Sequence, residues 1–306
     1  MGDVTYIQIK QKDGYLTNLT HYKCEKPPIA SILILHGMAE HQQRYEHFCS
    51  YLNSSSYDVY IYDHRGHGKE RRLFELGYIA PENGNQLIVS DAITASKYIE
   101  ENNRSSKLFL FGHSMGSLIA RNVIQSYDHY QGVILSGTMF PYYPMARTAY
   151  LIATITKHLK GPKKLSPFLN NLLFGSKYFT AHTSRTVFDW LTRSNPIVGA
   201  YIHDPYCGFL CTTTFYQDLL ALVLDASKNN LISKTNKNLP ILIASGEKDP
   251  VSSYTKEIKR YAAVLKELEF HNIDTKIYPE CRHEILNELN RDEVYSDIVT
   301  WMKSKL

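Results

Sequence analysis

The stretch KLFLFGHSMGSLIARNVIQS, residues 107–126, decides the fold. Its first five residues form a short apolar run, which is typical of a strand buried on both faces, and residues 117–126 have a helical pattern. Between them lies GHSMG, residues 112–116, the G-x-S-x-G pattern in a strand-turn-helix setting. In such a turn the serine is strained and its hydroxyl is lifted clear of the sheet, while the glycines avoid collisions. We therefore predict that Ser114 is a nucleophile.

Similar apolar runs and helical stripes alternate along most of the chain. The other predicted strands cover residues 15–22, 31–35, 58–62, 132–136, 241–245 and 275–278. Helical stripes recur at residues 87–99, 258–268 and 294–302. Strands that alternate with helices through short links predict an α/β fold, with a mostly parallel central sheet flanked by helices.

The alternation stops after Ser136 and resumes at Pro240. Residues 139–226 contain helical segments but no run typical of a buried strand, so we predict a helical insertion there, between core parts 1–138 and 227–306. The insertion carries eight of the 34 Lys and Arg residues but only four of the 30 Asp and Glu residues. The net charge of +4 therefore falls entirely on the insertion.

The composition indicates an ordinary globular protein. Hydrophobic residues make up 43% of the 306 residues and charged residues 21%, which argues against disorder, collagen and coiled coil. The chain shows no signal peptide and no apolar stretch near the ~18 residues of a membrane span. Five scattered cysteines indicate reduced thiols. We expect a cytoplasmic protein, peripheral at membranes where it meets them, and the small net charge argues against nucleic acid as a partner.

A serine nucleophile needs a base to take its proton and a carboxylate to orient that base. After a G-x-S-x-G turn these partners follow in the order acid, then His, at the ends of later strands. Asp249 and His283 each lie just past a predicted strand, where open α/β sheets place their sites. Glu247 shares the first loop but is expected to point elsewhere, and His271 precedes its strand. The predicted catalytic residues are Ser114, Asp249 and His283.

The segment HGMAEH, residues 36–41, follows the strand at 31–35. A turn here would present the backbone N–H of Met38 to the substrate carbonyl, beside the N–H of Met115. Two such donors would stabilise a tetrahedral oxyanion, each by roughly 3–4 kcal/mol. We expect nearby polar side chains to brace this loop, namely those of His36, Glu40, His41 and Arg44.

Two other groups of residues have alternative interpretations. DHRGHG, residues 63–68, brings an Asp and two His together, but a zinc site needs three or four convergent ligands and this loop offers no evident fourth. We interpret it as a glycine-dependent turn and expect neither a metal nor a cofactor. Cys207, Cys211 and Cys281 fall near the predicted site; thiol-sensitive activity is one interpretation, and packed neutral thiols are the preferred one.

Together these segments resemble a known family. Residues 34–41, 62–68 and 112–116, with the loops of Asp249 and His283, are similar to the monoglyceride lipase/lysophospholipase group of α/β-hydrolases, often filed with the serine aminopeptidase S33 family. The resemblance runs from about residue 14 to the last helix. DPYCGF, residues 204–209, resembles a segment near the end of the cap in bacterial lysophospholipase-like members.

The resemblance implies an α/β-hydrolase fold with Ser114, Asp249 and His283 as the triad. It also implies that the Met38 and Met115 amides form the oxyanion hole and that residues 139–226 are a lid-like cap over an acyl-chain tunnel. Monoglyceride lipases commonly carry a small pair where Met38 and Ala39 stand here. This departure concerns the shape of the pocket rather than catalysis, because only the amide of Met38 is needed.

The insertion opens with MFPYYPM, residues 139–145, and continues with a nearly apolar stretch. Such residues either pack the insertion onto the core or form an apolar mouth for an acyl chain. The basic turn at 157–164 is either a solvated face or a contact with anionic lipid. The substrate-binding candidates are Met139, Phe140, Tyr142, Met145, Cys207 and Phe209.

We therefore expect a serine hydrolase that cleaves carboxylic esters of single-chain lipids through an acyl-enzyme, as a monoacylglycerol lipase or lysophospholipase. Its partners would be an acyl ester or lipid and, transiently, a membrane surface touched by the insertion. The alternatives are a short-chain or aryl carboxylesterase, an aminopeptidase and a non-catalytic ligand-binding protein of the same fold. An aminopeptidase would need acidic groups to capture a free amine, and the insertion has four scattered Asp and no Glu.

Overall fold

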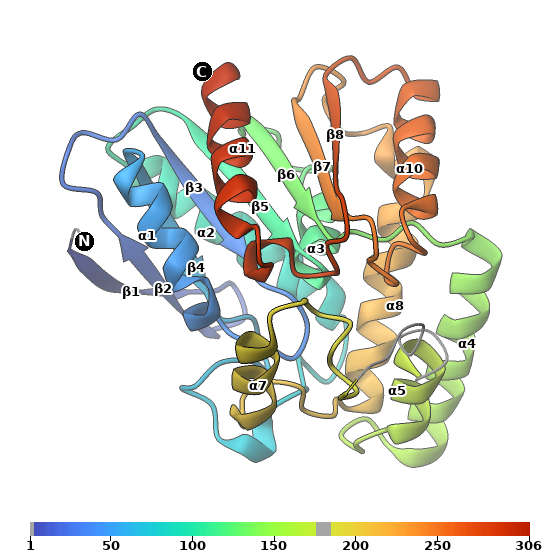
Figure 1. The fold of residues 1–306 in the computed structure, drawn as a ribbon. Helices are drawn as coiled ribbons and strands as arrows, with labels where there is room; N and C mark the ends of the chain where they lie inside the picture. The colour runs from blue at the N-terminus through green and yellow to red at the C-terminus, as the bar shows by residue number, and fades with distance from the viewer. Residues whose placement is uncertain (1–2, 176–184) are drawn as a thin grey trace.

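The computed structural model describes residues 3–175 and 185–306, and its centre is an eight-stranded sheet (Figure 1). β2 pairs antiparallel with β1 and β4, and all other neighbouring strands pair parallel. The predicted α/β fold with a mostly parallel sheet is confirmed. The strands in sheet order are β1 (Val4–Lys10), β2 (Leu16–Tyr22), β4 (Tyr57–Tyr62), β3 (Ala30–Leu35), β5 (Leu108–His113), β6 (Gly132–Ser136), β7 (Ile241–Gly246) and β8 (Ile273–Tyr278).

Helices cover both faces of the sheet. Alternate residues of β3 show why, because Ile32 packs into the apolar cluster on one face and Leu33 into the cluster on the other. The first face is covered by α1 (Glu46–Ser54) and α11 (Arg291–Ser304). The second is covered by α2 (Gly84–Asn102), α3 (Met115–Val123) and α10 (Lys256–Glu267). The central strands β4, β3, β5, β6 and β7 are therefore buried on both sides, as their continuous apolar runs predict.

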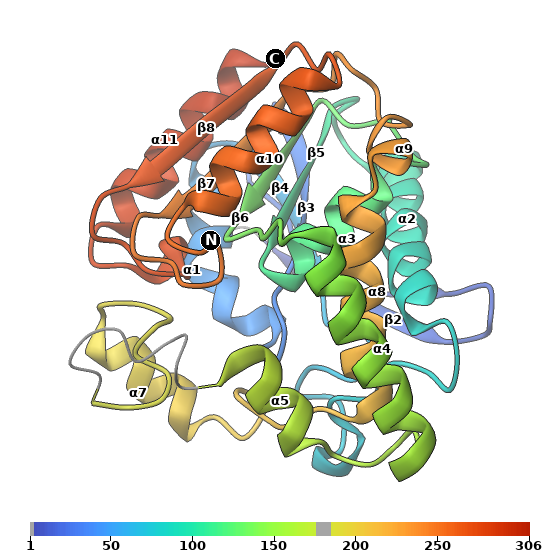
Figure 2. The same cartoon turned by 90° about the vertical axis from the view of Figure 1, so that its right-hand side faces the viewer.

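The segment between β6 and β7 is helical. Its described residues contribute no strand to the sheet, and its helices α4, α5 and α7 gather at one end of the sheet (Figure 1). α4 packs lengthwise along α8, which in turn contacts α2 and α3 (Figure 2). The helices are α4 (Tyr143–Lys160), α5 (Pro167–Phe174), α7 (Asn195–His203) and α8 (Thr213–Ser227), followed by the short α9 (Asn229–Ile232).

Two elements lie outside the predicted pattern. β1 is an edge strand whose only buried residue is Ile9, so its sequence carries a weak apolar signal. α1 buries three residues within nine and connects β3 to β4. None of the helices in residues 3–175 and 185–306 has the length and apolar character needed to cross a bilayer.

Candidate active site

Ser114 occupies the turn between β5 and α3. Its backbone φ is 53° and its ψ is −117°, a left-handed φ that is unusual for a residue other than glycine. A Cβ at Gly112 would lie 2.3 Å from the carbonyl oxygen of Gly116, and one at Gly116 would lie 2.0 Å from that of Leu35. Both flanking glycines are therefore sterically required, and the turn has the strain that the G-x-S-x-G pattern predicts.

Asp249 and His283 meet at the ends of β7 and β8. Nδ1 of His283 lies 3.0 and 3.1 Å from the two carboxylate oxygens of Asp249, and both side chains are buried. Burial alone would lower the pKa of His283, but the carboxylate outweighs it and raises the pKa above its usual value. With Nδ1–H donated to Asp249, Nε2 keeps its lone pair for a proton. Glu247 points away, toward Lys248 at 3.7 Å.

The sheet brings Ser114 and His283 to the same edge. A Cβ at Gly137, which follows β6, would lie 2.9 Å from the His283 ring. The centre of the His113 ring lies 4.8 Å from the centre of the His283 ring. Within the described part of the chain no hydrogen bond joins the Ser114 hydroxyl to His283. Such contacts are often long without substrate and tighten when it binds, so this arrangement suits a nucleophile and its base.

The loop at residues 36–41 lies against the nucleophile. A Cβ at Gly37 would stand 3.3 Å from the Cβ of Ser114. The Gly37 N–H donates to the Glu40 carboxylate at 2.5 Å, and the Gly37 carbonyl accepts from His36 Nδ1 at 2.7 Å. Because C=O and N–H of one trans peptide point in opposite directions, the His36 contact also sets the direction of the Met38 N–H. Met115, the other predicted donor, begins α3.

Two neutral histidines hold this loop. His36 Nε2 accepts from the backbone N–H of His64 at 3.0 Å, and burial lowers the pKa of His36 to about 4. His67 Nε2 accepts from the N–H of Ala39 at 3.1 Å, its Nδ1 donates to the carbonyl of Arg65 at 3.0 Å, and burial lowers its pKa to about 3. Each ring uses both nitrogens in these described contacts, so they brace the loop rather than bind a metal.

Arg44 links the loop to the histidine. Its guanidinium contacts Glu40 at 2.6 Å and Glu284, the neighbour of His283, at 2.6 and 2.7 Å. All three side chains are almost fully enclosed. Burial alone would raise the pKa of Glu284, but Arg44 lowers it to about 2. The ion pair therefore joins the two loops that flank the nucleophile.

His41, Asp204 and Cys207 form the one group among the described residues whose His, Cys and carboxylate atoms lie close enough for a metal ion, within 4.8 Å of one another. The Lys69 ammonium already lies 3.2 Å from Asp204, and His41 Nε2 lies 3.0 Å from the same oxygen. We assign this cluster to ion pairing.

Burial raises the pKa of Cys207 to about 12, that of Cys281 to about 11 and that of Cys211 well above its usual value, so the three thiols are neutral.

An apolar cavity of about 440 Å³ opens beside the Asp249 loop, a size typical of small-molecule sites. It lies between that loop, α4, α5 and α8. Of the substrate-binding candidates, Met139 and Met145 line it. The other lining residues are Pro141, Ala146, Thr148, Ala149, Ile152, Leu172, Leu173, Phe174, Leu219, Leu220, Val223, Pro250, Val251, Ser253 and Glu257.

The other four candidates lie elsewhere. Phe140 is buried against Tyr261, and Tyr142 is mostly exposed beside Arg260. Cys207 packs in a small cluster with Leu191 and Tyr201, and Phe209 contacts the His67 ring. None of the four lines the apolar cavity, and their role in binding stays a prediction.

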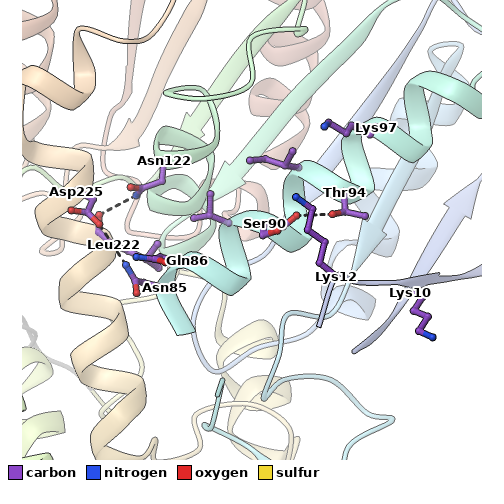
Figure 3. Close-up of a pocket in the computed structure, with 12 residues that line it drawn as sticks. Lys10, Lys12, Asn85, Gln86, Ser90, Thr94, Lys97, Asn122, Leu222 and Asp225 are labelled. Carbon is purple, nitrogen blue, oxygen red and sulfur yellow. Dashed lines mark hydrogen bonds between the residues drawn. The ribbon is translucent and has the colours of Figure 1, made fainter. Parts of the chain in front are cut away.

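A second cavity, of about 460 Å³, lies over α2 (Figure 3). Lys12, Thr94 and Lys97 lie toward one end and Asp225 at the other, with Ser90 between. It contains none of the predicted site residues, so the apolar cavity is the better candidate for the substrate.

The sequence did not reveal that residues 185–211 are hydrogen-bonded to the loop that carries His283. The N–H groups of His283 and Glu284 donate to the carbonyls of Trp190 at 3.4 Å and Leu191 at 2.7 Å. Arg193 contacts the buried Glu288 at 2.8 Å. Contacts made by main-chain carbonyls do not depend on the type of side chain and cannot be predicted from the sequence. The charge of Arg193 was the one feature of these contacts that the sequence could show.

Comparisons with known proteins identify the family of this chain. The family model described as serine aminopeptidase, S33, matches residues 26–290. The monoacylglycerol lipase of Mycolicibacterium smegmatis is 24% identical over 91% of this chain and 90% of its own length, and the human monoglyceride lipase is 24% identical over 96% and 88%. A solved carboxyl esterase from Bacillus coagulans, in complex with glycerol, has a TM-score of 0.89 at 25% identity and covers 99% of both chains.

The solved monoglyceride lipase of Saccharomyces cerevisiae, at 19% identity and a TM-score of 0.76, covers 99% of this chain and 96% of its own and shares the fold. The family match spans most of the chain and includes Ser114, Asp249 and His283. This protein therefore belongs to the serine aminopeptidase S33 family of α/β-hydrolases and is similar, within it, to monoglyceride lipases.

Proposed function

We propose that this protein is a serine hydrolase that cleaves carboxylic esters of single-chain lipids, as a monoacylglycerol lipase or lysophospholipase. The observation that carries the proposal is the Asp249–His283 pair, at 3.0 Å, on the sheet edge that also holds the strained turn of Ser114. The apolar cavity beside the Asp249 loop supplies a place for an acyl chain. The relatives named as monoglyceride lipases and as phospholipase support the same class of substrate.

The geometry suggests the following steps. Ser114 Oγ attacks the ester carbonyl while His283 Nε2 takes its proton, and the imidazolium returns that proton to the leaving alcohol oxygen. Asp249 holds the imidazole in the required tautomer and stabilises its charged form. The N–H groups of Met38 and Met115 stabilise the oxyanion. A water molecule, activated by His283, then releases the fatty acid from Ser114.

The 139–226 segment would form the roof of the acyl site. Met139 and Met145 line the cavity, and their flexible side chains suit chains of differing length. An aminopeptidase would instead need a free carboxylate near His283 to capture an amine. Among the described residues there, Glu40 and Glu284 are both paired with Arg44. Glu257, which lines the cavity, accepts hydrogen bonds from the Phe140 N–H at 2.6 Å and from the Ser253 hydroxyl at 2.9 Å. These contacts favour an ester of a neutral or zwitterionic alcohol.

A hydrolysis panel tests the proposal. It compares monoacylglycerols, lysophospholipids and p-nitrophenyl esters of rising chain length. We expect the ratio kcat/KM to rise with chain length as apolar contacts in the cavity are gained, by roughly 0.8 kcal/mol per buried methylene at most. A sharp preference for short esters would instead identify a short-chain carboxylesterase.

The outer side of α4 and α5 suits contact with a lipid surface. Leu151, Ile155 and Leu159, spaced four residues apart on α4, are 51%, 58% and 76% exposed. The exposed Lys163 and Lys164 lie in the turn that follows α4. Each basic residue near an anionic surface contributes roughly 1 kcal/mol. We propose that the outer side of α4 and α5 docks transiently on membranes or micelles.

Co-sedimentation with vesicles measures this docking. We expect binding to phosphatidylcholine vesicles to increase when phosphatidylserine is added, and Lys163→Glu with Lys164→Glu to remove the increase. Ile155→Ser should weaken binding to both kinds of vesicle. Lys234→Glu, an exposed lysine beyond α9, is the matched control. Equal binding of all these proteins to both kinds of vesicle would contradict the docking.

A further inference from the structure

Ala39 follows Met38 in the loop at residues 36–41 and is held from two directions. Its N–H donates to His67 Nε2 at 3.1 Å, on the core side. Its carbonyl accepts from the hydroxyl of Tyr201 and from the N–H of Gly208, each at 2.9 Å. The last two partners belong to the 139–226 segment, so Ala39 connects the core to that segment, in addition to the His41–Asp204 contact.

The backbone of Ala39 needs these contacts. Its φ is 52°, in the left-handed region that disfavours any residue with a Cβ. Such a conformation persists when the surroundings fix it. If Ala39 relaxed to a negative φ, the peptide between Met38 and Ala39 would rotate and strain the His36–Gly37 contact that sets the direction of the Met38 N–H. The Met38 N–H would then no longer point at the carbonyl of a substrate on Ser114.

Tyr201 is fixed before it reaches Ala39. Its ring is buried, with the Arg44 guanidinium 4.8 Å from one side and the Phe188 ring 5.0 Å away. Gly208 has a φ of 64°, and a Cβ there would lie 2.8 Å from the Phe188 ring and 3.1 Å from that of Tyr201. The two donors to the Ala39 carbonyl are therefore packed together in one rigid arrangement.

We propose that Tyr201 is a positioning residue for the oxyanion hole. Its hydroxyl keeps Ala39 in the left-handed conformation and thereby keeps the Met38 N–H aimed at the developing oxyanion. The role rests on the proposed function and extends it, because the 139–226 segment then takes part in catalysis besides roofing the acyl site. Efficient turnover requires this segment to be seated on the loop.

The test compares Tyr201→Phe with Tyr216→Phe. Tyr216 is a buried tyrosine of α8 whose hydroxyl donates to Asn170 at 2.9 Å, within the 139–226 segment and outside the loop at residues 36–41. Each substitution removes one buried hydroxyl from the same segment. Matched unfolding curves would show that any difference in activity does not come from a difference in folding.

Tyr201→Phe should lower kcat about tenfold, less than the 10²–10³-fold lost when an oxyanion donor is removed outright. KM for the same ester should change less than twofold. The inhibition constant of a long-chain trifluoromethyl ketone, whose serine adduct places an oxyanion in the hole, should rise by a factor similar to that of kcat. Tyr216→Phe should change kcat and this constant less than twofold.

Labelling by a fluorophosphonate separates this inference from the proposed function. If the unsubstituted protein is labelled and Tyr201→Phe keeps its kcat, or raises only KM, the positioning role is overturned while the serine hydrolase stands. If the unsubstituted protein is not labelled, the proposed function fails and the positioning role fails with it. A tenfold slower labelling of Tyr201→Phe would support the role without reference to a particular substrate.

Discussion

The two halves of the 139–226 segment differ in how they meet the core. α4 and α5 pack along α8, line the apolar cavity and leave a stripe of apolar residues exposed. Residues 185–211 are instead hydrogen-bonded to both loops that flank Ser114, through Trp190 and Leu191 on one side and Tyr201 and Gly208 on the other. One half has the features of a surface for lipid, and the other those of a support for catalysis. We therefore expect substitutions in the two halves to have different effects.

The largest expected effect lies outside both halves. Ser114→Ala should reduce ester hydrolysis at least 10⁴-fold and abolish fluorophosphonate labelling, because it removes the hydroxyl that attacks the ester carbonyl in the proposed reaction. The rate of hydrolysis of a p-nitrophenyl ester measures the loss. Retention of activity would show that the turn at Ser114 is structural. Residues 185–211 would then have no catalytic centre to support.

Arg193→Ala should weaken the supporting half. It leaves Glu288 buried without its cation, so we expect the free energy of unfolding to fall by about 2 kcal/mol, less than the 3–5 kcal/mol of a fully enclosed pair because Arg193 is partly exposed. Urea unfolding measures the change. Lys160→Ala, on the exposed end of α4, is the control and should stay within about 0.5 kcal/mol. Equal losses would remove the distinction between the halves.

The pH profile gives the smallest expected effect. His283 must be neutral to take the proton of Ser114, so kcat/KM should fall as the pH drops through its pKa. Because Asp249 raises that pKa, the midpoint should lie above the 6.5 of a free histidine. A profile of kcat/KM from pH 5 to pH 9 locates it. A midpoint well below 6.5 would show that Asp249 does not control the base.

Much of the fold and the candidate catalytic residues could be predicted from the sequence. Buried parallel strands are continuous apolar runs. Catalytic residues at strand ends follow a fixed chain order in this fold, so the sequence predicts Asp249 and His283 as partners, and the structure places them 3.0 Å apart. Phe140 packs against Tyr261 and does not line the cavity, and its predicted role in binding stays a prediction. An aromatic residue gives the same sequence signal in a packed position as in a binding site. Trp190 and Leu191 accept the N–H groups of His283 and Glu284 through main-chain carbonyls. Every residue has such a carbonyl, so the sequence gives no signal for these contacts.

The buried histidines of the loop divide the response to acid into two stages. Of His36, His67 and His283, His283 has the highest pKa, so acid first charges the base and activity is lost while the two bracing histidines stay neutral. His36 and His67 resist protonation in the folded state, whereas in the unfolded chain they take up protons near pH 6.5. Their contribution to stability is therefore complete above about pH 6.5 and declines as the pH falls toward their folded values. Mild acid should therefore abolish the activity of this protein reversibly, and stronger acid should unfold it.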